Sequence, residues 1–259
     1  MASSEFFFCS LLFSTMQYLS LFRLFMCALL LVASGASFGC SDNPTESDPA
    51  TDLSFSFENS ADGWTGSFAD YPTSKSAAEL ELIFDRRALP DDVSDPGMGL
   101  LLTGMNQSDD LFMFLKREVT GLEPNTSYTL TYHVTLASNS PSGCAGIGGA
   151  PGESVFLKVG AARVEPEAII ESGDYRLNVD KSNQASDGEN AIVIGNVANG
   201  VEQCTGDIPY RLITLDNEDK PFTITTDNTG TLWLLVGTES GFEGTTTLYY
   251  DRIEVNLDA

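Results

Sequence analysis

The feature that most constrains the fold is a strict alternation of apolar and polar residues between positions 128 and 136. Apolar side chains stand at every second position, and threonines and His133 stand between them. A period of two places one set on each face of an extended chain, so the segment is predicted to be a β-strand with one buried face. The apolar set is Tyr128, Leu130, Tyr132, Val134 and Leu136.

Strand patterns of this kind recur along the chain, and turn sequences such as Gly121–Asn125 and Asp227–Gly230 separate them. No segment keeps an apolar period of 3.6 residues. The chain is therefore expected to be all-β, with a single jelly-roll β-sandwich over residues 53–258. The expected strands are 53–57, 78–84, 98–103, 111–117, 128–136, 153–159, 174–180, 190–197, 208–215, 221–226, 230–236 and 245–257.

The N-terminal region has the layout of a secretory signal: Arg23, an apolar run at 24–33, then small residues up to Cys40. The Gly39-Cys40 junction resembles the lipobox of bacterial lipoproteins. That resemblance implies removal of residues 1–39, lipidation of Cys40 and anchoring in the cell envelope, with the outer membrane favoured over the inner membrane. A start of translation at Met16 would bring Arg23 close to the front of the leader.

The alternative is an uncleaved membrane helix, since the preceding residues 6–22 are apolar as well. Arg23 would then lie near the middle of the span, at a cost of about 2.5–3.5 kcal/mol on insertion scales. After the lipobox, residues 40–52 contain prolines and acids and no large apolar residue. This composition predicts a disordered tether between the lipid and the sandwich.

The chain is strongly acidic, with 37 acidic and 13 basic residues and a net charge of −24. Removal of residues 1–39 takes one residue of each sign, so the mature chain keeps this charge. A polyanion repels phosphate backbones, and nucleic acid is excluded as an expected partner.

Two cysteines, Cys144 and Cys204, remain after the leader and the lipidated residue are set aside. In an oxidising compartment they most simply form one disulfide, which would close a loop of about 60 residues. Two free buried thiols are the alternative.

Three segments together resemble the jelly-roll carbohydrate-binding modules that have a galactose-binding-like fold. Residues 55–64 contain Phe-Ser-Phe-Glu-Asn and then Asp-Gly-Trp, and residues 119–130 read VTGLEPNTSYTL. Residues 247–255 read TLYYDRIEV near the C-terminal end. The resemblance implies a sandwich that binds carbohydrate, and it covers both ends and the centre of the domain.

In such modules a structural calcium ion commonly joins the first strand to the last. The resemblance assigns Glu58 and Asp251 as its carboxylate ligands, together with backbone carbonyls. Ca²⁺ prefers six to eight oxygen ligands, and an ion bound only by the folded state would stabilise it. The alternative is that both residues are ordinary carboxylates at strand edges.

Candidate ligand-binding residues are polar groups that suit sugar hydroxyls, while Trp64 and Trp233 are expected inside the protein. His133 lies on the threonine-lined face of its strand, and residues 176–184 carry a dense set of amides and charges. Both have the plain alternative of a solvated surface. The candidates are His133, Arg176, Lys181, Asn183 and Gln184.

These features favour a lipid-anchored extracytoplasmic protein that binds a glycan or another polar ligand, with a structural calcium ion. One alternative is a polysaccharide lyase or hydrolase of the same fold, with His133 or Lys181 as base and Glu153 or Glu243 as acid. Another is a structural or adhesive surface lipoprotein without a small ligand.

Overall fold

A computed structural model describes residues 51–94, 96–108 and 110–259. The regular elements of this described part are all strands, and none of its segments is a helix long and apolar enough to cross a membrane. The predicted leader, Cys40 and most of the tether lie outside the described residues. The strands are β1 (Thr51–Phe55), β2 (Thr65–Ala69), β3 (Tyr71–Pro72), β4 (Ile83–Ala88), β5 (Met98–Met105), β6 (Phe112–Val119), β7 (Ser127–Ser138), β8 (Val155–Ala162), β9 (Ala168–Glu171), β10 (Asp174–Leu177), β11 (Ala191–Asn196), β12 (Arg211–Asp216), β13 (Phe222–Thr225), β14 (Leu232–Ser240) and β15 (Thr245–Asp258).

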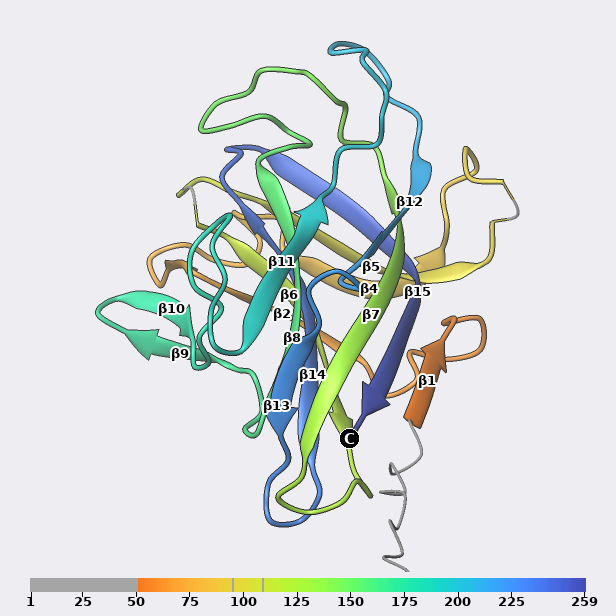
Figure 1. Ribbon diagram of the computed structural model, residues 1–259. Coiled ribbons are helices and arrows are strands. Elements are labelled where there is room, and N and C mark those ends of the chain that lie inside the picture. The colour runs from red at the N-terminus through yellow and green to blue at the C-terminus, as the bar shows by residue number, and fades with distance from the viewer. Residues whose placement is uncertain (1–50, 95, 109) are drawn as a thin grey trace, which may run out of the picture. The chain divides into compact units, whose positions relative to one another are not determined.

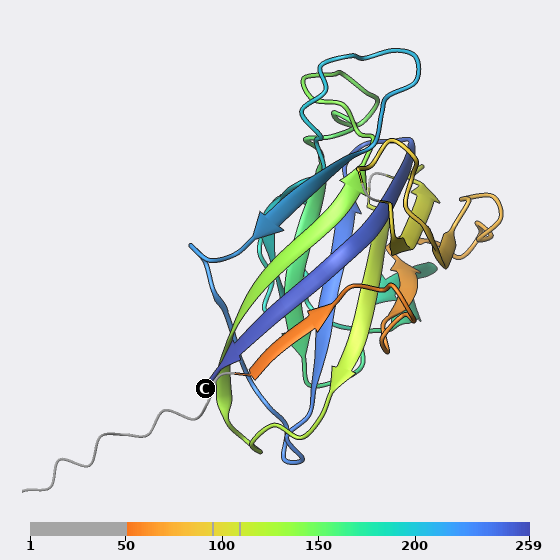
Figure 2. The same ribbon diagram turned by 90° about the vertical axis from the view of Figure 1, so that its right-hand side faces the viewer.

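Two antiparallel sheets form a jelly-roll β-sandwich, as predicted (Figure 1). One sheet has the order β12-β7-β15-β5-β4, with β1 paired to β15 and β13 paired to β7. The other has the order β11-β8-β14-β6-β2. The chain passes repeatedly from one sheet to the other, at β1–β2, β5–β6, β6–β7, β7–β8, β11–β12, β13–β14 and β14–β15, and between β2 and β4 by way of β3, as in a jelly roll. Figure 2 shows β7, β15 and β1 side by side in the first sheet.

The core lies between these sheets and is built by the alternation that the sequence displays. The apolar positions of β7, from Tyr128 to Leu136, are all buried, while His133 and its threonine neighbours face outward. Alternate residues of β14, such as Leu234 and Val236, and of β15, such as Ile253, pack into this core from the two sheets. The prediction for residues 128–136 is confirmed.

The five-stranded sheet is buried on its outer face as well. A smaller cluster on that face includes Phe112, Phe114 and Leu235, and Val179 of the segment after β10 packs on it. The chain between β8 and β11 therefore covers this sheet, and its β9–β10 hairpin pairs with β3 to form a small third sheet. In Figure 1 the β9–β10 hairpin projects from the body of the sandwich. Because both faces are covered, β6, β8 and β14 read as nearly continuous apolar runs.

The prediction of a strand at 78–84 is wrong over most of its length. Residues 77–81 form a tight turn, in which Leu80 N–H donates to Ser76 C=O and Glu81 has a positive φ of 53°. The Glu79 carboxylate accepts hydrogen bonds from the N–H and the hydroxyl of Ser76, a local capping arrangement that competes with extended structure. The strand of this region, β4, begins at Ile83.

Several other predicted strand boundaries shift by a few residues. Thr51 and Asp52, assigned to the tether, belong to β1 and pair with Leu257 and Asn256. The strand expected at 174–180 ends at Leu177, because Asp180 begins a hydrogen-bonded loop.

The predicted disulfide between Cys144 and Cys204 is present, with an S–S distance of 2.02 Å. It joins the long connections β7–β8 and β11–β12, which lie side by side at the top of Figure 1.

Candidate functional site

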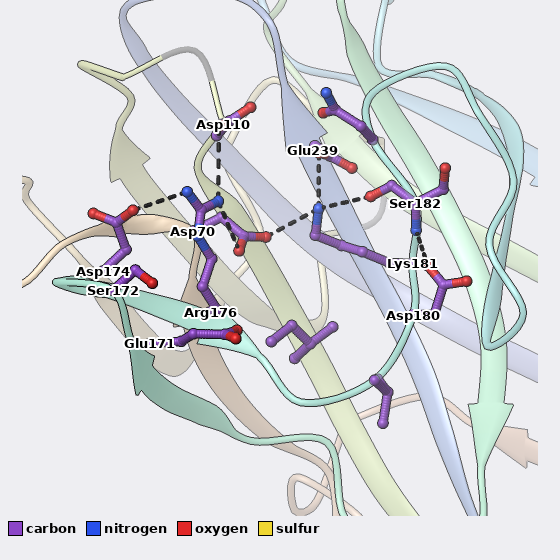
Figure 3. Close-up of a pocket in the computed structure, with 13 residues that line it drawn as sticks. Asp70, Asp110, Glu171, Ser172, Asp174, Arg176, Asp180, Lys181, Ser182 and Glu239 are labelled. Carbon is purple, nitrogen blue, oxygen red and sulfur yellow. Dashed lines mark hydrogen bonds and ion pairs between the residues drawn. The ribbon is translucent and has the colours of Figure 1, made fainter.

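A polar cavity of about 560 Å³ lies where the β9–β10 hairpin and the following loop meet the outer face of the five-stranded sheet. Its walls carry cations, hydroxyls and one amide, from Arg176, Lys181, Ser172, Ser182 and Asn183. These groups all belong to residues 172–183, and Figure 3 shows Asp70, Asp110 and Glu239 reaching them from distant parts of the chain. The carboxylates of the lining are Asp70, Asp110, Glu171, Asp174, Asp180 and Glu239.

The floor of the cavity is a row of buried ion pairs centred on Lys181. Its Nζ lies 2.9 Å from Asp70 Oδ2 and 2.8 Å from Glu239 Oε1. It also donates to Ser182 C=O, so three partners satisfy its three donors. The ring of Phe112 lies beneath the ammonium, with its centroid at 5.1 Å. These contacts fix Lys181 from every side.

A second lysine, Lys158 on β8, lies behind this floor and is fully buried. Its Nζ is 2.8 Å from Glu239 Oε2, and it donates to the carbonyls of Lys181 and Ser186. Burial lowers the pKa of Lys158, and the ion pair with Glu239 opposes that change. The pair ties the loop at 181–186 to the sheet, which gives the cavity a rigid base.

Arg176 forms the wall opposite Lys181 and is two-fifths exposed. Its Nη2 lies 2.8 Å from Asp174, and its Nη1 lies 3.5 Å from Asp70 and 3.8 Å from Asp110. Burial lowers the pKa of Arg176, but the hydrogen bond to Asp174 and the neighbouring carboxylates outweigh it, so the pKa is raised. A guanidinium held this way presents its remaining N–H groups to a ligand in a fixed direction.

Asp110 lines the cavity with a partly exposed side chain that lies near Arg176 (Figure 3). Burial raises the pKa of its carboxyl, and the charge of Glu239 adds to this effect while Arg176 opposes it. The neighbouring cations therefore do not fully compensate the negative charge of the Asp110 carboxylate. Hydroxyl donors from a ligand would stabilise this charged form.

Backbone hydrogen bonds shape the loop at the other side of the cavity. Asp180 accepts from the N–H groups of Ser182 and Glu189, and these bonds lower the pKa of its carboxyl. Ser182 has a positive φ of 58°. Asp70 also has a positive φ, of 59°, at the junction of β2 and β3, which turns its side chain toward Lys181. Aspartate tolerates this conformation better than most residues.

The structure brings together three of the five predicted ligand-binding residues: Arg176, Lys181 and Asn183 line the cavity. Gln184 follows them but lies against Gly241, outside the lining. His133 is on the outer face of the other sheet, where its Nε2 lies 3.4 Å from Glu218. His133 therefore does not share the cavity with Arg176, Lys181 and Asn183, because β7 belongs to the seven-stranded sheet and the segment after β10 packs on the five-stranded sheet.

The acids of the enzymatic alternative also lie apart from Lys181. Glu153 accepts a hydrogen bond from Gly143 N–H near the disulfide loop, and Glu243 follows β14 beyond the cavity. Neither is among the lining residues of the described chain. The carboxylates that contact Lys181 are those of Asp70 and Glu239.

Glu58 and Asp251, the predicted calcium ligands, lie near each other. Burial raises the pKa of Asp251, Arg252 lowers it, and the charge of Glu58 raises it further. No group of three or more acidic, histidine or cysteine side chains able to hold a metal occurs in the described part of the chain. The nearby carbonyls of Phe57 and Glu58 accept hydrogen bonds from Arg86. As they stand, these residues do not fit a resident ion that prefers six to eight oxygens.

The aromatic residues do not form a stacking platform in the cavity. Trp64 is buried against Phe55, as expected, but Trp233 is half-buried on the outer face, with Lys116 over its ring. Tyr71 and Tyr175 pack on each other, with ring centroids 4.7 Å apart. Recognition in this cavity must therefore rest on hydrogen bonds and charge.

No protein-family model matches this chain, and no curated protein matches it either. Among solved structures, it is similar to a family 11 carbohydrate-binding module of Clostridium thermocellum bound to a mixed-linked tetrasaccharide, with a TM-score of 0.37 and 10% identity over 79% of this chain and 94% of that one. It is also similar to the xylohexaose complex of the module-bearing xylanase 10B of the same organism, with a TM-score of 0.36 and 13% identity over 78% of this chain and 28% of that one.

A third similar structure is an adhesin domain of Lys-gingipain from Porphyromonas gingivalis, with a TM-score of 0.33 and 13% identity over 79% of this chain and 97% of that one. Scores below 0.5 do not extend a ligand or an activity to this chain. The function is therefore argued from the cavity itself.

Proposed function

We propose that this protein is a glycan-binding module and that the cavity between the β9–β10 hairpin and the five-stranded sheet is its binding site. The observation that carries the proposal is the cavity itself, about 560 Å³ in volume and floored by buried ion pairs. That volume is within the usual range for small-ligand sites. The rigid floor lowers the ordering cost of binding.

The chemistry of the lining suits hydroxyl groups. Carboxylates such as Asp110 and Asp174 accept hydrogen bonds, Arg176 donates them, and Asn183 does both. A sugar ring presents donors and acceptors at close spacing, so such a mixed set can pair with several hydroxyls at once. The excess of carboxylates over cations disfavours polyanionic ligands.

The enzymatic alternative has no comparable support, because its predicted acids and His133 lie away from Lys181. An adhesive surface protein would have the same fold and the same proposed location as a glycan-binding module. The glycan-binding experiment described below distinguishes the two. Anchoring through a lipid on Cys40 is part of the proposal, since a tethered module would hold its glycan at the cell envelope. Mass spectrometry of the mature protein tests it: an unmodified Cys40 would remove the anchor.

Substitution of Arg176 by alanine is expected to weaken glycan binding more than tenfold. A hydrogen bond to a charged group contributes about 1.5–3 kcal/mol, and tenfold in affinity corresponds to about 1.4 kcal/mol. The full-length chain in detergent is applied to a glycan array, and the best oligosaccharide is then titrated calorimetrically against the wild type and the variant.

Arg87→Ala is the matched control, because Arg87 forms an exposed ion pair with Asp85 away from the cavity. It is expected to bind like the wild type. If no glycan binds, the adhesive alternative is favoured. Equal affinities for Arg176→Ala and Arg87→Ala would remove the cavity as the site.

A further inference from the structure

A second cluster, separate from the cavity, surrounds Arg86 on β4. The backbone after β1 turns sharply at Phe57, which is buried and has a positive φ of 60°. This conformation is unusual for a bulky residue and persists only where the surroundings hold it. Arg86 Nε donates to Phe57 C=O at 2.6 Å, and Arg86 Nη2 donates to Glu58 C=O. One guanidinium therefore binds two successive carbonyls.

Negative charge gathers beside these carbonyls. Both oxygens of the Glu58 carboxylate lie 3.3 Å from Met98 N, at the start of β5. A side chain at Gly97 would place its Cβ only 1.9 Å from Glu58 Oε1, so the carboxylate is fitted against a glycine. Phe55 at the end of β1 lies opposite Ile253, so Asp251 on β15 lies beside the chain that continues to Phe57 and Glu58. Two carboxylates and two carbonyls form an electronegative corner where four strands meet.

Strand register shows why Arg86 belongs to this corner. Arg86 pairs with Leu100 on β5, and Leu100 pairs with Tyr250 on β15, the residue before Asp251. β1 pairs with residues 253–257 of β15 on the same side as β5, because β7 occupies the opposite side. The guanidinium thus joins β4 to the chain that leaves β1, next to the last strand.

We propose that Arg86 is a built-in cation that stabilises this corner in place of a divalent metal ion. Its planar fork donates to two successive carbonyls that an ion would otherwise bind. The fold therefore closes without calcium. When the guanidinium is removed, the corner becomes a vacant oxygen-rich site that Ca²⁺ can enter.

The test is the melting temperature of the full-length chain in detergent, first with EDTA and then with excess CaCl₂. The wild type is expected to melt at the same temperature in both. Arg86→Ala is expected to melt about 5 °C lower in EDTA, from the loss of charged hydrogen bonds, and to recover part of that loss in CaCl₂. Arg87→Ala, whose ion pair with Asp85 is exposed, is the control and is expected to follow the wild type.

Three results would each overturn the proposal: a wild type that gains several degrees from Ca²⁺, an Arg86→Ala variant that melts like Arg87→Ala, and an Arg86→Ala variant that ignores Ca²⁺. Glycan binding is measured separately, so these outcomes leave the proposed function unaffected.

Discussion

Replacing Lys158 with methionine is expected to lower the free energy of unfolding by about 3–5 kcal/mol, the usual cost of breaking a buried ion pair by removing one partner. Methionine has a similar length, so packing on β8 is largely kept. The loss is electrostatic: Glu239, which is 1% exposed, keeps only Lys181 as a partner. The carbonyls of Lys181 and Ser186 also lose a donor.

The measurement is urea unfolding followed by circular dichroism. Lys220→Met is the matched control, because Lys220 forms an ion pair with Asp187 in which both side chains are exposed. Exposed pairs contribute about 0–1 kcal/mol, so this variant is expected to unfold nearly like the wild type. Equal effects for the two lysines would show that the charges under the cavity are solvated and that its floor is not a rigid network.

Loss of the disulfide is the second large effect. Replacement of Cys144 and Cys204 by serine is expected to lower the free energy of unfolding by about 4 kcal/mol, from the chain entropy of a loop of 60 residues. The bond joins two long connections that are also linked by hydrogen bonds, from Ser142 N–H to Val201 C=O and from Asn199 N–H to Ser140 C=O. Because these contacts can remain in the double variant, the expected loss is that of the loop closure alone. Urea unfolding of the double variant measures the change.

The wild type treated with a reductant should reproduce the double variant, because the same constraint is removed without a change of sequence. If both unfold like the oxidised wild type, the two connections open separately from the sandwich. The chain-entropy account of this bond would then be wrong.

The fold could be predicted because alternation reports burial directly. For residues 128–136 the two-residue period was sufficient to predict the strand, and the burial of alternate side chains agrees with it. At 78–84 the same pattern misled, because Ser76 and Glu79 form a local hydrogen-bonded turn that leaves Leu80 buried without a strand. The spacing of apolar residues does not report hydrogen bonds between side chains and the backbone, which can favour a turn over a strand.

The site was predictable only in part. The polar run at 176–184 was visible in the sequence, but its partners Asp70, Asp110 and Glu239 come from distant segments that topology alone brings together. The sequence also contains a signal for the buried ion pair beneath the cavity. Lys158 and Glu239 are charged residues in otherwise apolar strands, and a buried charge is rare unless it is paired. Reading them as a pair would have placed β8 beside β14.

Trp233 is a residue whose burial the sequence pattern overestimated. Its apolar neighbours in β14 suggested burial, but alternate residues of that strand face a surface that is only partly covered. Whether an outward position is covered depends on where the segment between β8 and β11 lies, which strand periodicity does not report.

We propose that a glycan binds in the cavity beside Arg176 and Lys181. Hydrogen exchange of the full-length chain, with and without a saturating oligosaccharide chosen from the array, tests it most directly. We predict slower exchange of backbone amides in residues 171–184, with no change around His133 on β7. Protection centred on β7 and β12, with residues 171–184 unaffected, would contradict the claim.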